Sequence, residues 1–278
     1  GTSMIDNESA CMIKLPDETF VETREYLRFV EFCDATKKSK YIGVCYGPPG
    51  VGKTKSGRRY SNWDFQEAYL KHGMRKFLAP TEVREYDTLF FTPPVVHTAR
   101  EIMKAIANLR KWLNIFIIQS YTSEEIIDTK PREDATQLII IDEADRLSAQ
   151  GFEYLRSVYD EQSISVIFLG MPGLEKRLSR YPQLYSRVGF VHEFKTLSPV
   201  EVRQILQSRL EELGSKYSKP GFMDPEAIAA IVRITHGNFR LLLRLLMQIE
   251  RLMEINGMDT VSKELVEAAR EILIIGIS

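Results

Sequence analysis

Residues 47–54 of the chain read Gly47-Pro48-Pro49-Gly50-Val51-Gly52-Lys53-Thr54. This stretch matches the P-loop pattern, which runs glycine, four variable residues, glycine, lysine, and serine or threonine. The apolar run Tyr41–Tyr46 precedes it and predicts a buried strand, and a helix is expected to begin at Lys53. A loop of this kind between a strand and a helix is the context that the motif requires.

The residue types in this loop suit a triphosphate. Phosphate oxygens need many N–H donors, and a tight turn with Gly50 and Gly52 can point successive backbone amides inward. The following helix adds the positive end of its dipole. Lys53 would place a cation against the β- and γ-phosphates, and Thr54 would offer its hydroxyl to magnesium. We therefore expect residues 47–54 to bind ATP and Mg²⁺.

A second motif ends the most apolar run of the chain. Leu138–Ile141 predicts a buried strand, and Asp142 and Glu143 follow it directly. Asp142 is expected to hold magnesium through a water, and Glu143 to position and polarise the attacking water. An Asp-Glu pair after a strand is common alone, and the P-loop upstream makes it specific. Asp145 and Arg146 are interpreted as structural or interfacial residues.

Two more apolar runs, Thr88–Phe91 and Ile164–Leu169, predict further strands. Runs without polar alternation fit strands that are buried on both faces of a parallel sheet. Strands that alternate with helices predict an α/β fold, here a P-loop NTPase three-layer sandwich with a parallel central sheet. Apolar residues at helical spacing predict three helices in this part of the chain. The first spans about 17–38, with Asp17 or Thr19 as its cap, and the second runs from Lys53 to near Trp63. The third begins after Thr98, which is expected to cap it.

The pattern changes after Ser198-Pro199, which together are typical of a helix start, with serine as N-cap and proline at the first helical position. Four helical stretches without a strand predict a small all-helical domain: near 199–213, 225–235, 238–255 and 261–273. Gly-Thr-Ser before Met4 is typical of a tag remnant. The predicted division is a tag remnant and N-terminal segment (1–16), an ATPase domain (17–197) and a helical lid domain (198–278).

The composition restricts other functions. The chain is 27% charged with a formal net charge of −1, so nucleic-acid binding would need a local basic face or several aligned subunits. The three cysteines form no CxxC pair and the four histidines show no ligand spacing, which disfavours a zinc site. No apolar stretch approaches the roughly 18 residues of a membrane span, and we expect a cytoplasmic protein.

The P-loop, the Asp-Glu strand end and the helical stretch together resemble AAA+ ATPases, from about Asp17 to the C-terminus. The resemblance implies Mg²⁺-dependent hydrolysis of ATP to ADP and phosphate, completed by an arginine from a neighbouring subunit. Segment 180–188 resembles the one that carries this arginine finger, and Arg187 is the best match, with Arg177 and Arg180 as alternatives. Arg240 in Gly237-Asn238-Phe239-Arg240 resembles the sensor-2 arginine.

One position departs from the family. Gly170-Met171 stand where the sensor-1 residue is usually polar, and neither side chain can fix a water well. Hydrolysis is therefore expected to be slow, and sensor 1 is left without an assigned residue.

A narrower resemblance rests on three segments, IIIDEADRL (139–147), VIFLGMPGLEKRLSRYPQLYSRVGF (166–190) and GNFRLLLRLL (237–246). They are similar to the AAA+ regulators of DNA transposition, the group of TnsC, TniB and the Mu B protein. The similarity implies ATP-dependent, sequence-nonspecific binding of duplex DNA and a homo-oligomer in the form of a ring or helical filament. It also implies recruitment or activation of a transposase, with a target-selection protein as a further candidate partner.

In that group, a basic helix after a Pro-Pro turn faces DNA. The equivalent helix here follows Pro93-Pro94 and carries Arg100 and Lys104, which are four residues apart and share a face. Contacts from them would go to the phosphate backbone. Two alternatives remain open: an AAA+ switch that acts on protein partners without DNA, in signalling or secretion, and a helicase-loader-type ATPase.

Overall fold

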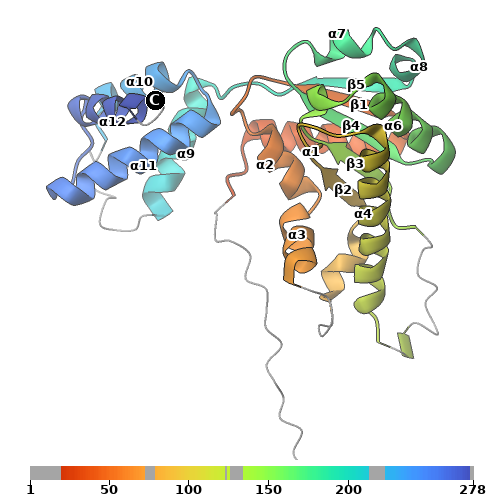
Figure 1. The fold of residues 1–278 in the computed structure, drawn as a ribbon. Helices are drawn as coiled ribbons and strands as arrows, with labels where there is room; N and C mark the ends of the chain where they lie inside the picture. The colour runs from red at the N-terminus through yellow and green to blue at the C-terminus, as the bar shows by residue number, and fades with distance from the viewer. Residues whose placement is uncertain (1–19, 73–78, 123, 126–133, 213–222, 276–278) are drawn as a thin grey trace, which may run out of the picture.

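A five-stranded parallel sheet organises the first part of the chain (Figure 1). The computed structural model describes residues 20–72, 79–122, 124–125, 134–212 and 223–275. The strands lie in the order β2-β3-β4-β1-β5. Their bounds are β1 Ile42–Tyr46, β2 Thr88–Phe91, β3 Leu138–Ile141, β4 Ser165–Gly170 and β5 Val188–Glu193. The prediction of an α/β fold with a parallel central sheet is confirmed, and four of these strands coincide with the predicted runs.

Strand β5 was not predicted from the sequence. It lies at an edge of the sheet, and its residues alternate between half-buried and exposed. Continuous apolar runs are typical of strands that are covered on both faces. Val188–Glu193 is only partly covered, so its sequence shows no such run.

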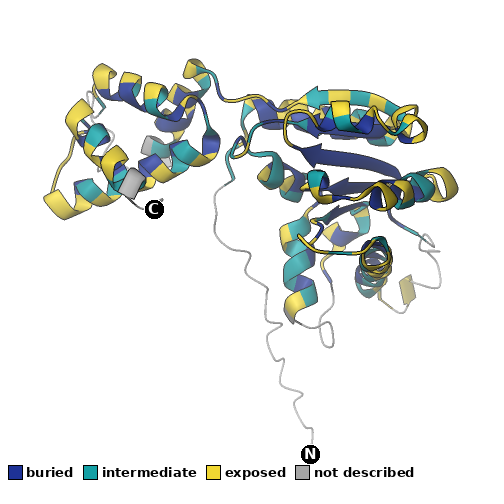
Figure 2. Cartoon of the chain, turned by 45° about the horizontal axis from the view of Figure 1, so that its top comes forward, coloured by how far each residue is buried: buried dark blue, intermediate teal, exposed yellow. Residues whose placement is uncertain are grey.

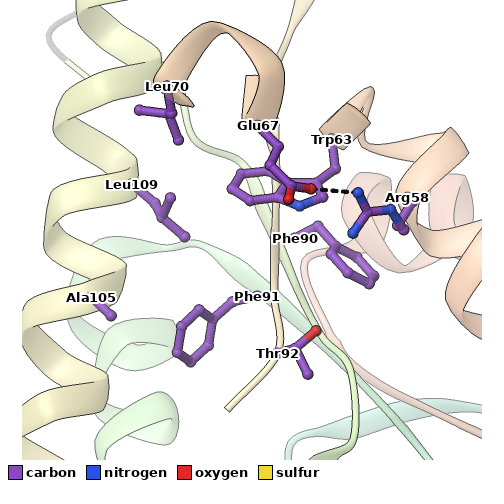
Figure 3. A pocket seen from close by; sticks show the side chains of 9 residues that line it. All are labelled: Arg58, Trp63, Glu67, Leu70, Phe90, Phe91, Thr92, Ala105 and Leu109. Atoms are coloured by element: carbon purple, nitrogen blue, oxygen red, sulfur yellow. Dashed lines mark hydrogen bonds and ion pairs between the residues drawn. The ribbon is translucent and has the colours of Figure 1, made fainter. Parts of the chain in front are cut away.

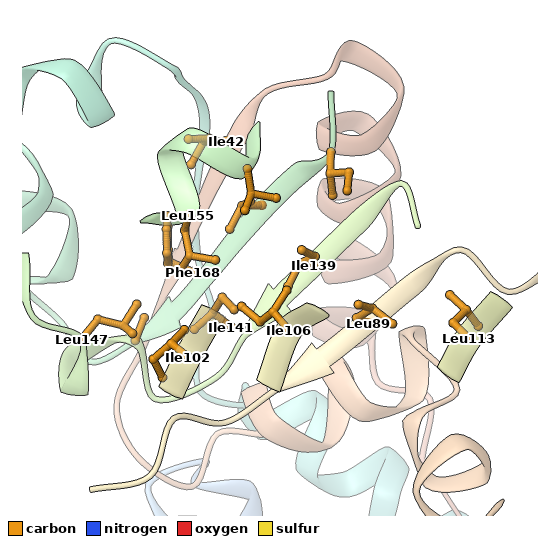
Figure 4. Close-up of a cluster of buried hydrophobic side chains, with 14 of the residues drawn as sticks. Ile42, Leu89, Ile102, Ile106, Leu113, Ile139, Ile141, Leu147, Leu155 and Phe168 are labelled. Carbon is orange, nitrogen blue, oxygen red and sulfur yellow. The ribbon is translucent and has the colours of Figure 1, made fainter. Parts of the chain in front are cut away.

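Helices cover both faces of the sheet, so the fold has three layers (Figure 2). Successive residues of β3 alternate between two cores: Ile139 and Ile141 pack with α4 and α6 on one face, as Figure 4 shows, and Leu138 and Ile140 pack with α1 on the other. The helices of this part are α1 Arg24–Ser39, α2 Lys53–Tyr60, α3 Trp63–His72, α4 Ala99–Gln119, α6 Ala149–Gln162, α7 Leu174–Leu178 and α8 Pro182–Tyr185, with short 3₁₀ turns η1 Thr81–Glu85 and η2 Ala144–Arg146.

Two predicted helix boundaries were wrong. Helix α1 is capped by Thr23, whose hydroxyl accepts a hydrogen bond from the Tyr26 amide at 2.9 Å; the predicted caps, Asp17 and Thr19, lie outside the described residues. Trp63 begins α3 and does not end the helix that starts at Lys53. The chain turns at Asn62, which has a φ of 56°, so the predicted single helix is divided in two.

The chain after β5 is helical, as predicted. Its four helices are α9 Pro199–Glu212, α10 Pro225–Thr235, α11 Phe239–Asn256 and α12 Lys263–Ile275. The Ser198 hydroxyl accepts from the Glu201 amide at 3.2 Å, and Glu201 accepts from the Ser198 amide at 3.3 Å, which forms a capping box at the start of α9. These helices bury an apolar cluster of their own beside the sheet (Figure 1). None of the described helices is long and apolar enough to cross a membrane.

Candidate nucleotide-binding site

The P-loop begins at the carboxyl end of β1, between the ends of β4 and β5. The Gly47 amide donates to the Gly170 carbonyl at 3.1 Å, and the Phe194 amide donates to the Tyr46 carbonyl at 2.8 Å. A Cβ atom at position 47 would lie 2.5 Å from the Phe194 carbonyl oxygen. Only glycine fits this place, because the obstacle is backbone that is itself held by a sheet hydrogen bond.

Two further glycines shape the loop. Gly50 and Gly52 have φ angles of 80° and 113°, in the left-handed region that glycine adopts without a steric penalty. Helix α2 begins directly after Gly52, at Lys53. The last residues of the loop therefore form the N-terminus of α2, where free backbone amides and the helix dipole favour an anion.

The Lys53 side chain folds back over the loop. Its ammonium donates to the Gly47 carbonyl at 2.5 Å and to the Pro48 carbonyl at 2.8 Å. Burial lowers the pKa of Lys53, and the carboxylates that follow β3 oppose this shift. The cation is thus held at the mouth of the loop, close to acidic groups that come from a distant part of the sequence.

Thr54 and Asp142 meet across the site. The Thr54 hydroxyl donates to Asp142 Oδ2 at 2.8 Å, and Asp142 is only 4% exposed. Burial raises the pKa of Asp142, and the hydrogen bond from Thr54 acts against that shift. A hydroxyl and a carboxylate oxygen side by side are hard oxygen donors of the kind that Mg²⁺ prefers. This pair therefore fits the metal that the sequence motif implies.

Glu143 stands in an uncommon backbone conformation. Its φ and ψ are 50° and 42°, a left-handed geometry that costs a residue with a Cβ atom about 1 kcal/mol or more. The bend takes the chain out of β3 into η2 and leaves Glu143 exposed beside the buried Asp142. The two carboxylates of the motif thus have different surroundings, one buried against Thr54 and one open to solvent.

The N-terminus of α11 rests directly on the P-loop. The Arg240 amide donates to the Gly50 carbonyl at 2.8 Å, and the Asn238 side-chain amide donates to the Pro49 carbonyl at 2.8 Å. A Cβ atom at Gly50 would lie 2.7 Å from Asn238 Oδ1. Two hydrogen bonds therefore join the N-terminus of α11 to the backbone of the loop. Asn238 was not selected from the sequence, although it stands in the Gly-Asn-Phe-Arg motif.

Comparison with known proteins identifies the family. A family model described as "AAA domain" matches residues 36–178, just over half of the 278 residues. The chain belongs to the AAA domain family. A Staphylococcus aureus protein named "Potential ATP-binding protein" is 45% identical over 267 residues, which covers 94% of this chain and 98% of that protein. The resemblance to AAA+ proteins is thereby confirmed, whereas the narrower group of transposition regulators is not distinguished.

Solved structures agree on the fold of this AAA protein. The RuvB Holliday junction branch migration motor of Thermotoga maritima superposes with a TM-score of 0.57 at 16% identity, covering 91% of this chain and 70% of RuvB. The ORC1 protein of Aeropyrum pernix, in complex with DNA, gives a TM-score of 0.58 at 19% identity, covering 94% of this chain and 68% of ORC1. At such low identity these likenesses concern the fold alone.

The predicted arginine finger of this AAA protein lies far from its own P-loop. The Arg187 carbonyl accepts from the Ile42 amide at 3.0 Å, at the amino end of β1, whereas the P-loop follows the carboxyl end. Five residues of strand separate the two ends by about 16 Å. The Arg187 guanidinium donates to Asp160 Oδ1 at 2.6 Å and to the Gln183 carbonyl. Arg187 therefore does not join the site of its own chain.

The two alternative arginines differ from each other. Arg177 donates to the Asp145 and Leu147 carbonyls, both at 2.6 Å, and stacks on the Phe152 ring, so it holds its own chain together. Arg180 is exposed.

The residues predicted to touch DNA lie on a different surface. Arg100 and Lys104 are exposed on α4, outside the nucleotide site. The Thr98 cap of this helix is confirmed, because its hydroxyl accepts from the Glu101 amide at 3.2 Å. A cavity of about 460 Å³ beside the edge strand β2, between α3 and α4, contains none of the predicted site residues (Figure 3). Its lining residues are Arg58, Trp63, Glu67, Leu70, Phe90, Phe91, Thr92, Ala105 and Leu109.

Replacing Asn238 by Ala is expected to destabilise the protein by about 1 kcal/mol, because Asn238 also caps α11 by accepting from the Leu241 amide at 3.1 Å. Urea unfolding measures this change. Asn238→Ser is the matched variant, since serine keeps a cap but cannot reach the Pro49 carbonyl. Equal stability of the serine and wild-type proteins would mean that the bond to the P-loop contributes nothing to the fold.

Proposed function

We propose that this protein is an ATP-dependent, sequence-nonspecific DNA-binding ATPase that oligomerises on target DNA and recruits or activates a transposase. The observation that carries the ATPase part is the contact between Thr54 of the P-loop and the buried Asp142, with Glu143 beside it. The name of the Staphylococcus aureus relative, which covers nearly the whole chain, supports ATP as the nucleotide.

The residues of the P-loop and of the Asp-Glu pair have different roles in hydrolysis. The amides of residues 47–54 and the Lys53 ammonium bind the phosphates. Thr54 and Asp142 would hold Mg²⁺, which when bound offsets charge on the phosphate oxygens. Glu143 accepts a proton from the attacking water, whose oxygen bonds to the γ-phosphorus while the bond from phosphorus to the β–γ bridging oxygen breaks. ADP leaves with that electron pair, and the accepted proton passes on to solvent or product.

A second copy of the chain completes the site. Arg187 cannot reach its own P-loop, and it is exposed enough to exchange Asp160 for a phosphate of a neighbouring subunit. A head-to-tail contact of this kind generates a ring or a helical filament. Arg187 would then neutralise charge on the transferring phosphoryl group.

The helices after Ser198 act as a lid in this proposal. Their own apolar core supports a division into an ATPase domain at 17–197 and a lid domain at 198–278. Arg240 would reach the γ-phosphate as the sensor-2 residue. Its backbone already bonds to Gly50, so nucleotide binding and lid position would be coupled through one short contact.

DNA would bind along α4. Arg100, Lys104 and Lys111 are exposed and lie in one row of the helix, spanning about 16 Å. Such a row offers cations to a phosphate backbone and carries no sequence information. A filament would repeat the row along the duplex, so modest contacts would add up despite the net charge of −1. ORC1, which shares the fold, is described in complex with DNA, and RuvB is described as a Holliday junction branch migration motor.

A switch that acts on protein partners is the second candidate. Val95 and Val96 are 76% and 88% exposed at the tip of the loop after β2. Two neighbouring exposed valines favour contact with an apolar surface of a partner. This candidate predicts ATPase activity that does not respond to DNA.

The double variant Arg100→Glu/Lys104→Glu is expected to weaken duplex binding at least tenfold in the presence of a slowly hydrolysed ATP analogue, because each reversal replaces attraction to phosphate by repulsion. Fluorescence anisotropy with labelled duplexes of two unrelated sequences measures it. Lys38→Glu/Lys263→Glu, at two exposed sites on other elements, makes the same change in net charge and should bind normally. Equal wild-type binding with and without nucleotide would contradict the proposed function.

A further inference from the structure

The carboxylate of Asp145 occupies the space beside Gly170. The Met171 amide donates to Asp145 Oδ2 at 2.9 Å, and a Cβ atom at position 170 would lie 2.5 Å from the same oxygen. Gly170 ends β4, and its carbonyl accepts from the first amide of the P-loop, that of Gly47, at 3.1 Å. Asp145 therefore stands at the end of β4, next to the start of the P-loop.

The backbone around Asp145 is fixed on both sides. The turn η2 that carries it follows the left-handed Glu143. Arg177 reaches across from α7 and donates to the Asp145 and Leu147 carbonyls, both at 2.6 Å. The half-buried side chain is thus aimed at one place by two separate elements, and the absence of a side chain at Gly170 leaves room for it.

The end of β4, at residues 170–171, is the position at which the sequence lacks the polar side chain usual in the family. Gly170 and Met171 have none that can orient a water, yet a carboxylate from the neighbouring strand's turn fills the gap. A carboxylate offers about four acceptor positions, and the Met171 amide uses one of them. It would repel a phosphate oxygen but can accept a hydrogen bond from water. Asp145 also belongs to the group of carboxylates that favours the charged form of Lys53.

We propose that Asp145 is a second water-positioning residue of the hydrolysis site and takes the place of the missing polar side chain at residues 170–171. The assignment rests on the proposed ATPase function. One proton of the attacking water goes to Glu143 as the bond to the γ-phosphorus forms and the bond to the bridging oxygen breaks. The other proton remains hydrogen-bonded to Asp145, which fixes the direction of attack.

The isosteric variant Asp145→Asn tests this assignment. Its carbonyl oxygen can still accept from the Met171 amide, but its NH₂ group donates where a carboxylate oxygen would accept. We expect kcat for phosphate release to fall about 10- to 100-fold, the usual effect of losing a hydrogen bond to a charged group. The Kd for a slowly hydrolysed ATP analogue and the thermal unfolding midpoint should stay at wild-type values. Glu31→Gln, an equal charge change on α1, should alter none of the three.

A second pair of variants moves the polar group to the other strand. Asp145→Ala is expected to lower kcat, and Asp145→Ala/Gly170→Asn should recover part of it, because the asparagine would occupy the space of the lost carboxylate from β4 once the Leu174 side chain, whose Cδ2 lies 2.7 Å from that Cβ position, has shifted. A structural role alone predicts a different pattern, in which Asp145→Asn is normal and Asp145→Ala loses thermal stability and kcat together.

The outcomes separate the two proposals. Wild-type phosphate release with an equally active Asp145→Asn protein would overturn the assignment of Asp145 and leave the ATPase standing. A parallel loss of analogue binding in Asp145→Asn would also overturn it. No phosphate release from the wild-type chain, with or without duplex DNA, would overturn both.

Discussion

Replacing Glu143 by Gln is expected to lower kcat for ATP hydrolysis by about 10²- to 10⁴-fold, because the amide cannot accept a proton from the attacking water. The Glu143 side chain is exposed, and the hydrogen bond that joins Thr54 to Asp142, where a metal would sit, does not involve it. Nucleotide binding should therefore survive. Phosphate release gives kcat, and displacement of a fluorescent ATP analogue gives the Kd.

Lys53→Ala provides the contrasting variant. It removes the cation that would meet the β- and γ-phosphates, so binding and hydrolysis should fall together. Glu31→Gln, which changes charge equally on α1, serves as the inactive control and should behave as the wild type. If Glu143→Gln hydrolysed ATP at the wild-type rate, the general base would have to be another carboxylate, and the role given to the Asp-Glu pair would be wrong.

Glu143→Gln would also keep ATP bound, because it hydrolyses ATP slowly. If ATP closes the contact between subunits, Glu143→Gln with ATP should behave as the wild type does with a slowly hydrolysed analogue. Its complexes with duplex DNA should then persist longer than those of the wild type with ATP. Anisotropy after addition of unlabelled duplex measures that lifetime, and equal lifetimes would contradict a role for hydrolysis in disassembly.

Much of the ATPase fold could be predicted because its motifs are local. The residues of the P-loop are contiguous, and their glycines are needed where φ is positive. Strands β1, β2, β3 and β4 are continuous apolar runs because both of their faces are covered. The capping box at Ser198 and Glu201 likewise involves only four consecutive residues.

The remaining features depend on residues that are distant in the sequence. The contact of Asp145 with the Met171 amide joins two turns 26 residues apart, and no local pattern marks it. Arg177 was an alternative to Arg187 as the arginine finger, but the tertiary fold directs it to carbonyls of its own chain. The break at Asn62 was missed for another reason, since asparagine tolerates the left-handed region without the glycine or proline that signals a turn.

Replacing Arg187 by Ala is expected to lower kcat by about 10³- to 10⁵-fold, the range found for arginines that neutralise charge on a transferring phosphoryl group. The loss should occur in the neighbour's site, because Arg187 lies at the opposite end of β1 from its own P-loop. Binding of nucleotide to the isolated subunit should therefore be unchanged. Arg187→Lys should recover little, since an ammonium lacks the planar fork of donors.

The ion pair with Asp160 provides a control within the same contact. Asp160→Asn keeps Arg187 but weakens the bond at 2.6 Å that holds it in the isolated chain. If assembly transfers the guanidinium from Asp160 to a phosphate, this variant should hydrolyse ATP at least as fast as the wild type. A loss equal to that of Arg187→Ala would instead mean that the pair supports the fold of β5 and α6, and thermal unfolding would show the corresponding destabilisation.

Mixing two inactive variants tests the contact between subunits directly. Glu143→Gln lacks a working site but supplies an intact Arg187, whereas Arg187→Ala keeps a working site but lacks the arginine. In a randomly mixed head-to-tail assembly, about a quarter of the interfaces would join an intact site to an intact arginine. An equimolar mixture should thus recover about a quarter of the wild-type rate, well above either variant alone. A mixture as inactive as its components would exclude Arg187 as a residue that acts between subunits. An intact Glu143 and an intact Arg187 would then meet at some interfaces without restoring hydrolysis.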